Sequence, residues 1–456
     1  MTLLVAETRA TAEPAARLLQ HGDDATRLPR AELEALQLAG VRARFEQLRQ
    51  QIAVLTVLAD QQRITAVEQL DDVAPLLFQH TMYKSYPIKL LLRHRFADLT
   101  RWLQRLTAVD LSRLPTAGLT GIDAWLDALD AHTTLRVITS SGTSGTMSFL
   151  PKSTVELEDF GASFELPSGG RRDVVWPNFR RGSSAWCRVA ELLERRVAGG
   201  PERFHALHPG RMSADLQLLA ARVRAAQARG ERLDLDESLV LRQAEFEAQQ
   251  RELRDAVPRY LAELDSEVRG KSAFVCGLSN VTFQLAQAGI AAGIEDLFAP
   301  DTVVTVGGGG KGIALPPDFE EIIARFTGVA AIDVIYGMSE VNAANRRCER
   351  GRYHIVPTAV LYVLDPEDGH VLPREGEQTG RAAFYDLLAQ TYWGGFVTGD
   401  EVTVDWAPCR CGRTTPHLAP AIQRYSEKRG GDDKITCATT EEAQETALDF
   451  LTGELE

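Results

Sequence analysis

The sequence predicts an α/β fold that begins with a helical region, and three observations carry this prediction. From residue 13 to about residue 129, apolar residues recur at spacings of three and four, as in amphipathic helices. Short β-branched runs follow, and most of them end at glycine. Further helical stretches separate these runs, a pattern that favours an α/β sheet.

The N-terminal helical prediction depends on two segments, AELEALQLAGVRARFEQLRQQIAVL and KLLLRHRFADLTRWLQRL. The strand predictions after them are the runs LRVITSSG, SAFVCG, DTVVTVGGGG, AAIDVIYG and AVLYVLD, then FYDLL and GGFVTGDEVTVDW. Two charged helical stretches lie between residues 213 and 270, and a final helix is predicted over EEAQETALDFL after Thr440. We therefore expect a helical entry region over 1–130, an α/β core over 131–430 and a short C-terminal piece over 431–456.

Composition excludes several classes of protein. The formal net charge of -13 argues against a nucleic-acid partner, which usually requires a basic footprint. Six cysteines in 456 residues are too sparse and irregular for a disulfide scaffold. The apolar runs are shorter than the roughly 20 residues of a membrane span, and the N-terminus lacks the pattern of a signal peptide. We expect a cytoplasmic protein with no membrane partner.

A loop rich in serine, threonine and glycine follows the strand-like run that ends at Ile138. In α/β folds such a position exposes backbone N–H groups to ligands. The glycines allow phosphate oxygens to approach the backbone, and the hydroxyls can replace lost water without adding charge. The candidate phosphate-binding residues are Ser140, Ser141, Gly142, Thr143, Ser144 and Gly145, with Thr139 before them.

Two later segments supply the carboxylates that the first loop lacks. YGMSE ends at Glu340, and VTGD ends at Asp400. One carboxylate can hold Mg²⁺ against phosphates, and the other can accept hydrogen bonds from ribose hydroxyls. Together the three segments predict an ATP site. The run GGGGKG is not a P-loop, because Gly312 follows Lys311 where that motif needs Ser or Thr, and Thr305 replaces its first glycine.

These three segments, in this order, resemble the adenylate-forming superfamily of acyl-CoA synthetases, adenylation domains and luciferases. The likeness covers residues 139–435 and is closest to the phenylacetate-CoA ligase and acyl-protein synthetase branch, through CERGRYHIVPTAVLYVLDPEDGHVLP and VTGDEVTVDWAPCRCGRTTPHL. The resemblance implies the large sheet-containing N-terminal domain of those enzymes. It also implies ATP-dependent, AMP-forming activation of a carboxylic acid, followed by transfer to a thiol or an amine, either of a small molecule or of a carrier or partner protein.

The resemblance also implies roles for individual residues. Glu340 would hold magnesium with Ser339 beside it as a phosphate hydroxyl, and Asp400 would bind the ribose. The adenine would lie against a glycine segment and under Tyr336, unless that tyrosine is simply a core aromatic. The glycines implied are Gly307, Gly308 and Gly309, with Gly337 next to the tyrosine.

The chain departs from the superfamily at three places. Five residues separate the phosphate loop from Pro151 and Lys152, so Lys152 either reaches a phosphate or is a surface lysine. The hinge-like RGGDDKI has glycine where the ribose-contacting arginine is expected, and Arg413, Arg424 or Arg429 would replace it. Only 22 residues follow Lys434, which predicts that the mobile C-terminal domain is nearly absent and that Lys434, Lys428 or another protein replaces its catalytic lysine.

A metal site is predicted from cysteine and histidine positions that match the same branch. Cys348, His354, Cys409 and Cys411 would make a closed tetrahedral zinc site of three thiolates and one imidazole. Such a closed site is structural, and it would fix the YGMSE and VTGD segments relative to each other. The alternative is a set of ordinary buried or surface thiols.

The sequence leaves the function open between an AMP-forming ligase and two alternatives. One is a nucleotide-binding scaffold without turnover, and the other is adenylation of a non-carboxylate oxyanion. The segment HTMYKSYP, residues 80–87, either lines an acyl pocket or packs among helices. The identity of the acid and the oligomeric state cannot be deduced from these motifs.

Overall fold

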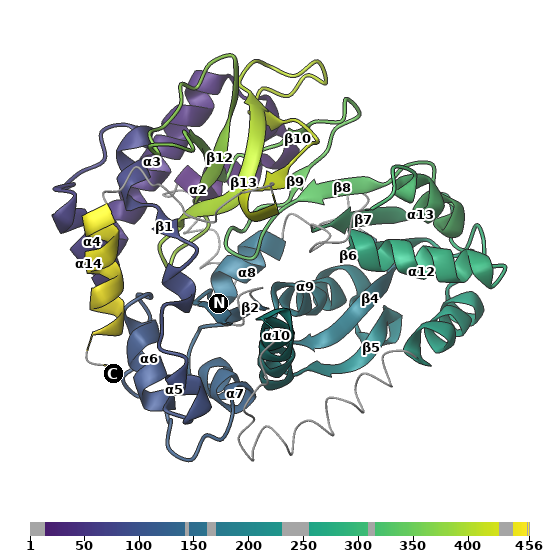
Figure 1. Cartoon of the computed structure of the whole chain (residues 1–456). Coiled ribbons are helices and arrows are strands. Elements are labelled where there is room, and N and C mark those ends of the chain that lie inside the picture. The colour runs from purple at the N-terminus through teal and green to yellow at the C-terminus, as the bar shows by residue number, and fades with distance from the viewer. Residues whose placement is uncertain are drawn as a thin grey trace, which may run out of the picture.

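The structure, a computed structural model, describes residues 14–141, 146–161, 170–229, 255–308, 315–427, 441–453 and 455. Two large sheets and one two-stranded sheet organise these residues (Figure 1). The six-stranded sheet has the order β5-β4-β6-β7-β8-β9, and all neighbours are parallel except β8 and β9. The seven-stranded sheet has the order β10-β14-β13-β12-β11, with β1 and β15 also paired to β13.

The elements have the following bounds. The α-helices are α2 (Pro14–His21), α3 (Arg30–Leu48), α4 (Ala53–Gln61), α5 (Lys89–Leu92), α6 (Phe96–Gln104), α7 (Ile122–His132), α8 (Thr154–Gly161), α9 (Ala185–Leu193), α10 (Ala214–Arg229), α12 (Ser279–Ala291), α13 (Phe319–Thr327) and α14 (Glu441–Thr452). The strands are β1 (Phe78–Gln79), β2 (Ile138–Ser141), β3 (Met147–Leu150), β4 (Asp173–Gly182), β5 (Phe204–Met212), β6 (Ala273–Leu278), β7 (Val303–Gly307), β8 (Asp333–Tyr336), β9 (Asn345–Arg346), β10 (Tyr353–His354), β11 (Ala359–Leu364), β12 (Glu377–Asp386), β13 (Gly395–Asp405), β14 (His417–Leu418) and β15 (Gln423–Arg424).

The six-stranded sheet is buried on both faces, which explains why its strands read as continuous apolar runs. Val174 and Trp176 of β4 pack with α9 on one face. Val175, which points the other way, packs with α12, α13 and the helical residues 255–267 on the opposite face. The strands predicted over SAFVCG, DTVVTVGGGG and AAIDVIYG are therefore β6, β7 and β8 of this sheet.

The N-terminal helices share a core with the seven-stranded sheet (Figure 1). Phe45 of α3 meets the ring of Trp393 edge-on at a centroid distance of 6.2 Å. The Gln37 amide, also from α3, donates to the Pro357 carbonyl at 2.9 Å. These contacts attach the helical region to the part of the chain that carries VTGD. The division into 1–130, 131–430 and 431–456 stays a prediction.

The C-terminal helix α14 returns to the N-terminal region and packs on α4. Arg105 donates to the carbonyls of Phe450 and Gly453 at the end of this helix, and its guanidinium lies 5.1 Å from the centre of the Phe450 ring. A cation at a helix C-terminus is favourable because unpaired carbonyls give that end a partial negative charge. In the described residues, no helix combines the length and the apolar composition that a membrane crossing needs.

The run LRVITSSG differs from expectation in its pairing. Its strand, β2, does not join the six-stranded sheet but pairs with β3 as an antiparallel hairpin, with Ile138 opposite Leu150. The two strands are separated by only a few residues in the sequence, so this local pairing has a low entropic cost. We call residues 138–150 the serine-rich hairpin.

Candidate functional site

The serine-rich hairpin is fixed to the carboxyl end of β4. The Thr139 amide donates to the Ser183 carbonyl at 2.8 Å, and the two side-chain hydroxyls lie 3.0 Å apart. Ser183 is followed by Ser184, whose side chain accepts from the Cys187 amide and caps α9. The hairpin therefore starts where the six-stranded sheet ends, at the edge where open α/β sheets bind ligands.

Glycines at the ends of β7 and β8 allow close packing at the same edge. Gly308 has φ of +81°, a left-handed conformation that side chains disfavour. A Cβ on Gly307 would lie 2.4 Å from the Ile335 side chain, and one on Gly337 would lie 2.7 Å from the Ala343 carbonyl oxygen. The predicted adenine-side glycines Gly307 and Gly308 thus lie beside the strand that carries Tyr336.

Tyr336 and Asp400 are brought together although they come from different sheets. The Tyr336 hydroxyl, at the end of β8, donates to Asp400 Oδ2 at 2.8 Å, and Asp400 lies in β13. Burial and the neighbouring Asp400 carboxylate raise the pKa of Tyr336 above its ordinary value, so its hydroxyl remains a proton donor. This contact joins the YGMSE and VTGD segments directly.

Arg424 is the arginine beside Asp400. Its Nε lies 3.5 Å from Asp400 Oδ1, and the two residues face each other across β15 and β13. Arg413 lies instead in the turn that carries the cysteines, where its carbonyl accepts from the Cys409 amide at 2.9 Å. Among the candidates from the sequence, Arg424 is thus the arginine in contact with Asp400, and Arg429 lies outside the described residues.

Glu340 and Ser339 lie in the loop that follows Tyr336, and both are half-buried. Burial raises the pKa of the Glu340 carboxyl, while the charges of Lys152 and Arg424 oppose that rise. A cation that binds next to a buried carboxylate stabilises the ionised form of that carboxylate. Glu340 is therefore suited to a divalent metal ion.

Lys152 is buried, which excludes the surface position left open by the sequence. It is 2% exposed, and its ammonium donates to Asn342 Oδ1 at 2.7 Å. Burial lowers the pKa of Lys152, and the carboxylates of Asp386, Glu156 and Glu340 act against this. Lys152, which lies two residues after the hairpin, therefore shares its electrostatic environment with Glu340.

Sequence reasoning missed the polar side chains around Lys152. Asn342, Asp386 and Tyr392 are buried and hydrogen-bonded to one another. Only Asn342 carried any signal, because it lies two residues after the end of YGMSE. The predicted residues Gly142, Thr143, Ser144, Gly145, Gly309 and Lys434 lie outside the described residues, as does the side chain of Ser141.

The segment predicted either to line an acyl pocket or to pack among helices buries its methionine and both of its tyrosines. Met82, Tyr83 and Tyr86 are each 3% exposed or less. The Tyr83 hydroxyl donates to the Trp393 carbonyl at 3.2 Å, and the Tyr86 hydroxyl donates to the Met147 carbonyl of the hairpin at 2.7 Å. The packing alternative is the one that these contacts support.

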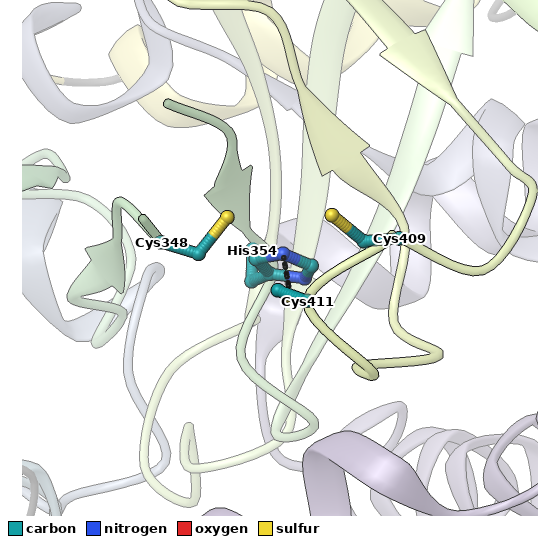
Figure 2. Close-up of side chains that lie close together, drawn as sticks. All are labelled: Cys348, His354, Cys409 and Cys411. Carbon is teal, nitrogen blue, oxygen red and sulfur yellow. Dashed lines mark hydrogen bonds between the residues drawn. The ribbon is translucent and has the colours of Figure 1, made fainter. Parts of the chain in front are cut away.

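The four predicted metal ligands converge where the chain passes between the two sheets (Figure 2). Cys348 and His354 come from the β9–β10 segment, and Cys409 and Cys411 come from the turn between β13 and β14. Their ligand atoms all lie within 4.8 Å of one another, and Cys411 Sγ is 3.3 Å from His354 Nε2. Side chains far apart in the sequence thus form one cluster.

Two similar turns present the cysteines. The Gly351 amide donates to the Cys348 carbonyl at 2.8 Å, and the Gly412 amide donates to the Cys409 carbonyl at 2.9 Å. Both glycines have positive φ, +74° and +88°, which favours glycine at these positions. The backbone turns therefore hold Cys348 and Cys409 in similar local conformations.

His354 is prepared to act as a ligand through Nε2. Its Nδ1 lies 3.3 Å from Thr415 Oγ1 and its Nε2 lies 3.3 Å from Cys411 Sγ, so Nε2 is the ring nitrogen that faces the cysteines. Burial lowers the pKa of His354 to about 4, and the positive charge of Arg413 adds to this effect. A lowered pKa favours the uncharged imidazole, which is the form that binds metal ions.

Comparison with solved structures finds this fold in a 2-hydroxyisobutyryl-CoA ligase. Its open conformation, in complex with 2-HIB-AMP and CoA, matches 88% of this chain and 77% of that chain, with a TM-score of 0.53 at 13% identity. Its thioesterification state, also with 2-HIB-AMP and CoA, matches 87% and 69%, with a TM-score of 0.52 at 14% identity. No protein-family model and no curated protein matches the chain. The likeness confirms the predicted α/β fold, which this chain shares with the ligase.

Proposed function

We propose that the protein is an AMP-forming ligase that activates a carboxylic acid as its adenylate. In this reaction a carboxylate oxygen attacks the α-phosphorus of ATP, the bond to the β-phosphate oxygen breaks, and pyrophosphate leaves. A thiol or amine then attacks the acyl carbon and releases AMP. The acceptor is coenzyme A, an amine, or a thiol on a carrier or partner protein.

The observation that carries this proposal is the meeting of three distant segments at one sheet edge. The serine-rich hairpin binds the end of β4 through Thr139, and Tyr336 binds Asp400 across the two sheets. The positive charge of Lys152 lowers the pKa of Glu340, so these two side chains also interact electrostatically. Hydroxyls, a cation and two carboxylates at one edge match the groups of MgATP.

Each residue has a distinct role in the proposed site. Asp400 accepts hydrogen bonds from the ribose hydroxyls, with Arg424 next to it, and Tyr336 together with Gly307 and Gly308 forms the adenine side. Glu340 would hold Mg²⁺, which neutralises phosphate charge when bound, and Ser339 donates to a phosphate oxygen. The Lys152 ammonium binds a phosphate oxygen.

The cysteine cluster is proposed to hold a structural zinc ion. Tetrahedral zinc with Zn–S bonds of about 2.3 Å requires sulfurs about 3.8 Å apart, and the four ligand atoms here lie within 4.8 Å of one another. Four protein ligands leave no open position, so the ion would bind no substrate. Its effect would be to fasten the β9–β10 segment to the β13–β14 turn.

Pyrophosphate release in the presence of ATP, Mg²⁺ and a panel of aryl, aliphatic and amino acids tests the proposal. We expect release that depends on one class of acid. ATP binding without release from any acid, and with no partner protein restoring it, would instead indicate a nucleotide-binding scaffold. Release that depends on a non-carboxylate oxyanion would change the substrate class.

Replacing Asp400 with asparagine should lower kcat/KM for ATP at least tenfold, about 1.4 kcal/mol in transition-state binding. The reason is the loss of a charged acceptor for the ribose. The measurement compares ATP with 2′,3′-dideoxy-ATP in both proteins, and the penalty for the missing hydroxyls should shrink in the variant. Asp368→Asn is the matched control, because that carboxylate is 67% exposed on a distant turn. An equal penalty in Asp400→Asn and wild type would contradict the assignment.

A further inference from the structure

A buried cation without a carboxylate partner is an unusual feature of the proposed site. The Lys152 ammonium has one hydrogen-bond acceptor among the described residues, the neutral amide oxygen of Asn342. In the same part of the chain, no carboxylate oxygen lies within 4.0 Å of its Nζ, although the lysine is only 2% exposed. Burying a charge without a paired ion is costly, so the arrangement is best satisfied when an anion binds.

Asn342 is held at its backbone by Asp386 and at its side chain by Tyr392. The Asn342 amide N–H donates to Asp386 Oδ2 at 2.8 Å, and its side-chain Nδ2 donates to the Tyr392 hydroxyl at 3.3 Å. The Tyr392 hydroxyl in turn donates to Asp386 Oδ2 at 2.8 Å. The amide oxygen of Asn342 is therefore oriented towards Lys152 by a closed set of hydrogen bonds.

Asp386 is itself immobilised. Its second oxygen accepts from the Leu388 amide at 2.9 Å, and the residue is 1% exposed at the end of β12. The segment between Asp386 and Tyr392 is fixed from the other side, where Glu156 accepts from the amides of Gln390 and Thr391 at 2.6 Å each. Both ends of the hydrogen-bonded set are thus attached to rigid parts of the fold.

We infer that Asp386 and Tyr392 are positioning residues, which through Asn342 hold the Lys152 ammonium and the Glu340 loop at the phosphate end of the site. This inference rests on the proposed function. Asn342 is two residues from Glu340, and Lys152 lies two residues after the serine-rich hairpin, so one hydrogen-bonded set orders the phosphate cation and the metal carboxylate together. Hydrogen bonds that served only to stabilise the fold would not need to end at the Lys152 ammonium, near the Glu340 carboxylate.

Nucleotide selectivity distinguishes positioning from general support of the fold. Tyr392→Phe removes only the hydroxyl, and we expect ATP to bind about fivefold more weakly while adenosine binds unchanged. Lys152→Met should weaken ATP binding about thirtyfold, again without affecting adenosine. Dissociation constants from calorimetry or fluorescence, with the melting temperature of each variant, provide the comparison.

The decisive arm is the double variant. If Tyr392 acts through Lys152, Tyr392→Phe in the Lys152→Met background should weaken ATP binding by less than twofold. Tyr362→Phe is the matched control, because its hydroxyl is equally buried and donates to the Leu70 carbonyl at 2.8 Å on another part of the sheet. It should leave the ATP-to-adenosine ratio unchanged.

Three outcomes would overturn the inference. These are equal losses for ATP and adenosine in Tyr392→Phe, a full effect of that substitution in the double variant, or unchanged ATP binding in Lys152→Met. If the Asp386→Asn variant folds, it provides a second measurement of the coupling to Lys152. Because binding needs no turnover, a wild type that binds ATP but releases no pyrophosphate would overturn the proposed function while leaving this test intact.

Discussion

Replacing Glu340 with glutamine is expected to slow acid-dependent ATP–pyrophosphate exchange by about a hundredfold. The substitution keeps the shape of the side chain but removes the charge that would hold Mg²⁺ against the phosphates. Because the substitution weakens Mg²⁺ binding, raising the Mg²⁺ concentration should recover part of the rate. Glu367→Gln, on an exposed turn, is the matched control and should stay within twofold of wild type. An exchange rate in Glu340→Gln equal to that of the wild type would contradict the role of Glu340 as the magnesium ligand.

The same residue predicts a pH dependence with a definite sign. Burial raises the pKa of Glu340 above its ordinary value of 4.5, and only the ionised form binds magnesium. Activity should therefore fall as the pH falls through this raised pKa, at a higher pH than an exposed glutamate would give. Added Mg²⁺ should move the inflection to lower pH, since it favours the carboxylate. Glu340→Gln should lack the inflection, and a profile unchanged by the substitution would contradict this assignment.

Replacing Cys409 with serine should release zinc and lower the melting temperature by about 10 °C, because several kcal/mol of metal-linked folding energy is lost. Wild-type protein purified under reducing conditions without chelator should contain about one equivalent of zinc by elemental analysis. Chelation should reproduce the effect of the substitution. KM for ATP should rise with zinc loss, because the cluster joins the segments that carry Tyr336 and Asp400.

The control for this experiment is Cys187→Ser. Cys187 is fully buried, and its thiol lies 3.7 Å from the Phe179 carbonyl, a contact that a serine hydroxyl can keep. This variant should retain its zinc and most of its stability. Wild-type protein without zinc would overturn the proposed metal site, and the four side chains would then be ordinary buried thiols and a buried imidazole.

Local sequence patterns predicted the strands and the approximate position of the site. The runs that became β6, β7 and β8 are apolar and end near glycine, as buried parallel strands at a ligand-binding edge do. The convergence of Cys348, His354, Cys409 and Cys411 was expected from the resemblance to the phenylacetate-CoA ligase branch, because no local pattern brings together two pairs that lie far apart in the sequence. Properties fixed within a few residues, such as the strands, were accessible from the sequence itself.

Contacts between distant segments were not predictable in the same way. The Tyr336–Asp400 hydrogen bond depends on how two sheets meet, and the choice of Arg424 over Arg413 depends on the register of β15 against β13. The burial of Lys152 depends on Asn342, Asp386 and Tyr392 folding around it. No local pattern marks Asp386 or Tyr392, because their partners lie far away in the sequence.

Transfer of oxygen-18 from the acid to AMP tests the central claim most directly. An active acid from the panel, labelled in its carboxylate, is incubated with the protein, ATP, Mg²⁺ and an acceptor amine or thiol, and the nucleotide product is analysed by mass spectrometry. Attack on the α-phosphorus predicts AMP that carries one labelled oxygen, formed together with pyrophosphate. ADP as the nucleotide product, or AMP without label, would contradict the formation of an acyl adenylate.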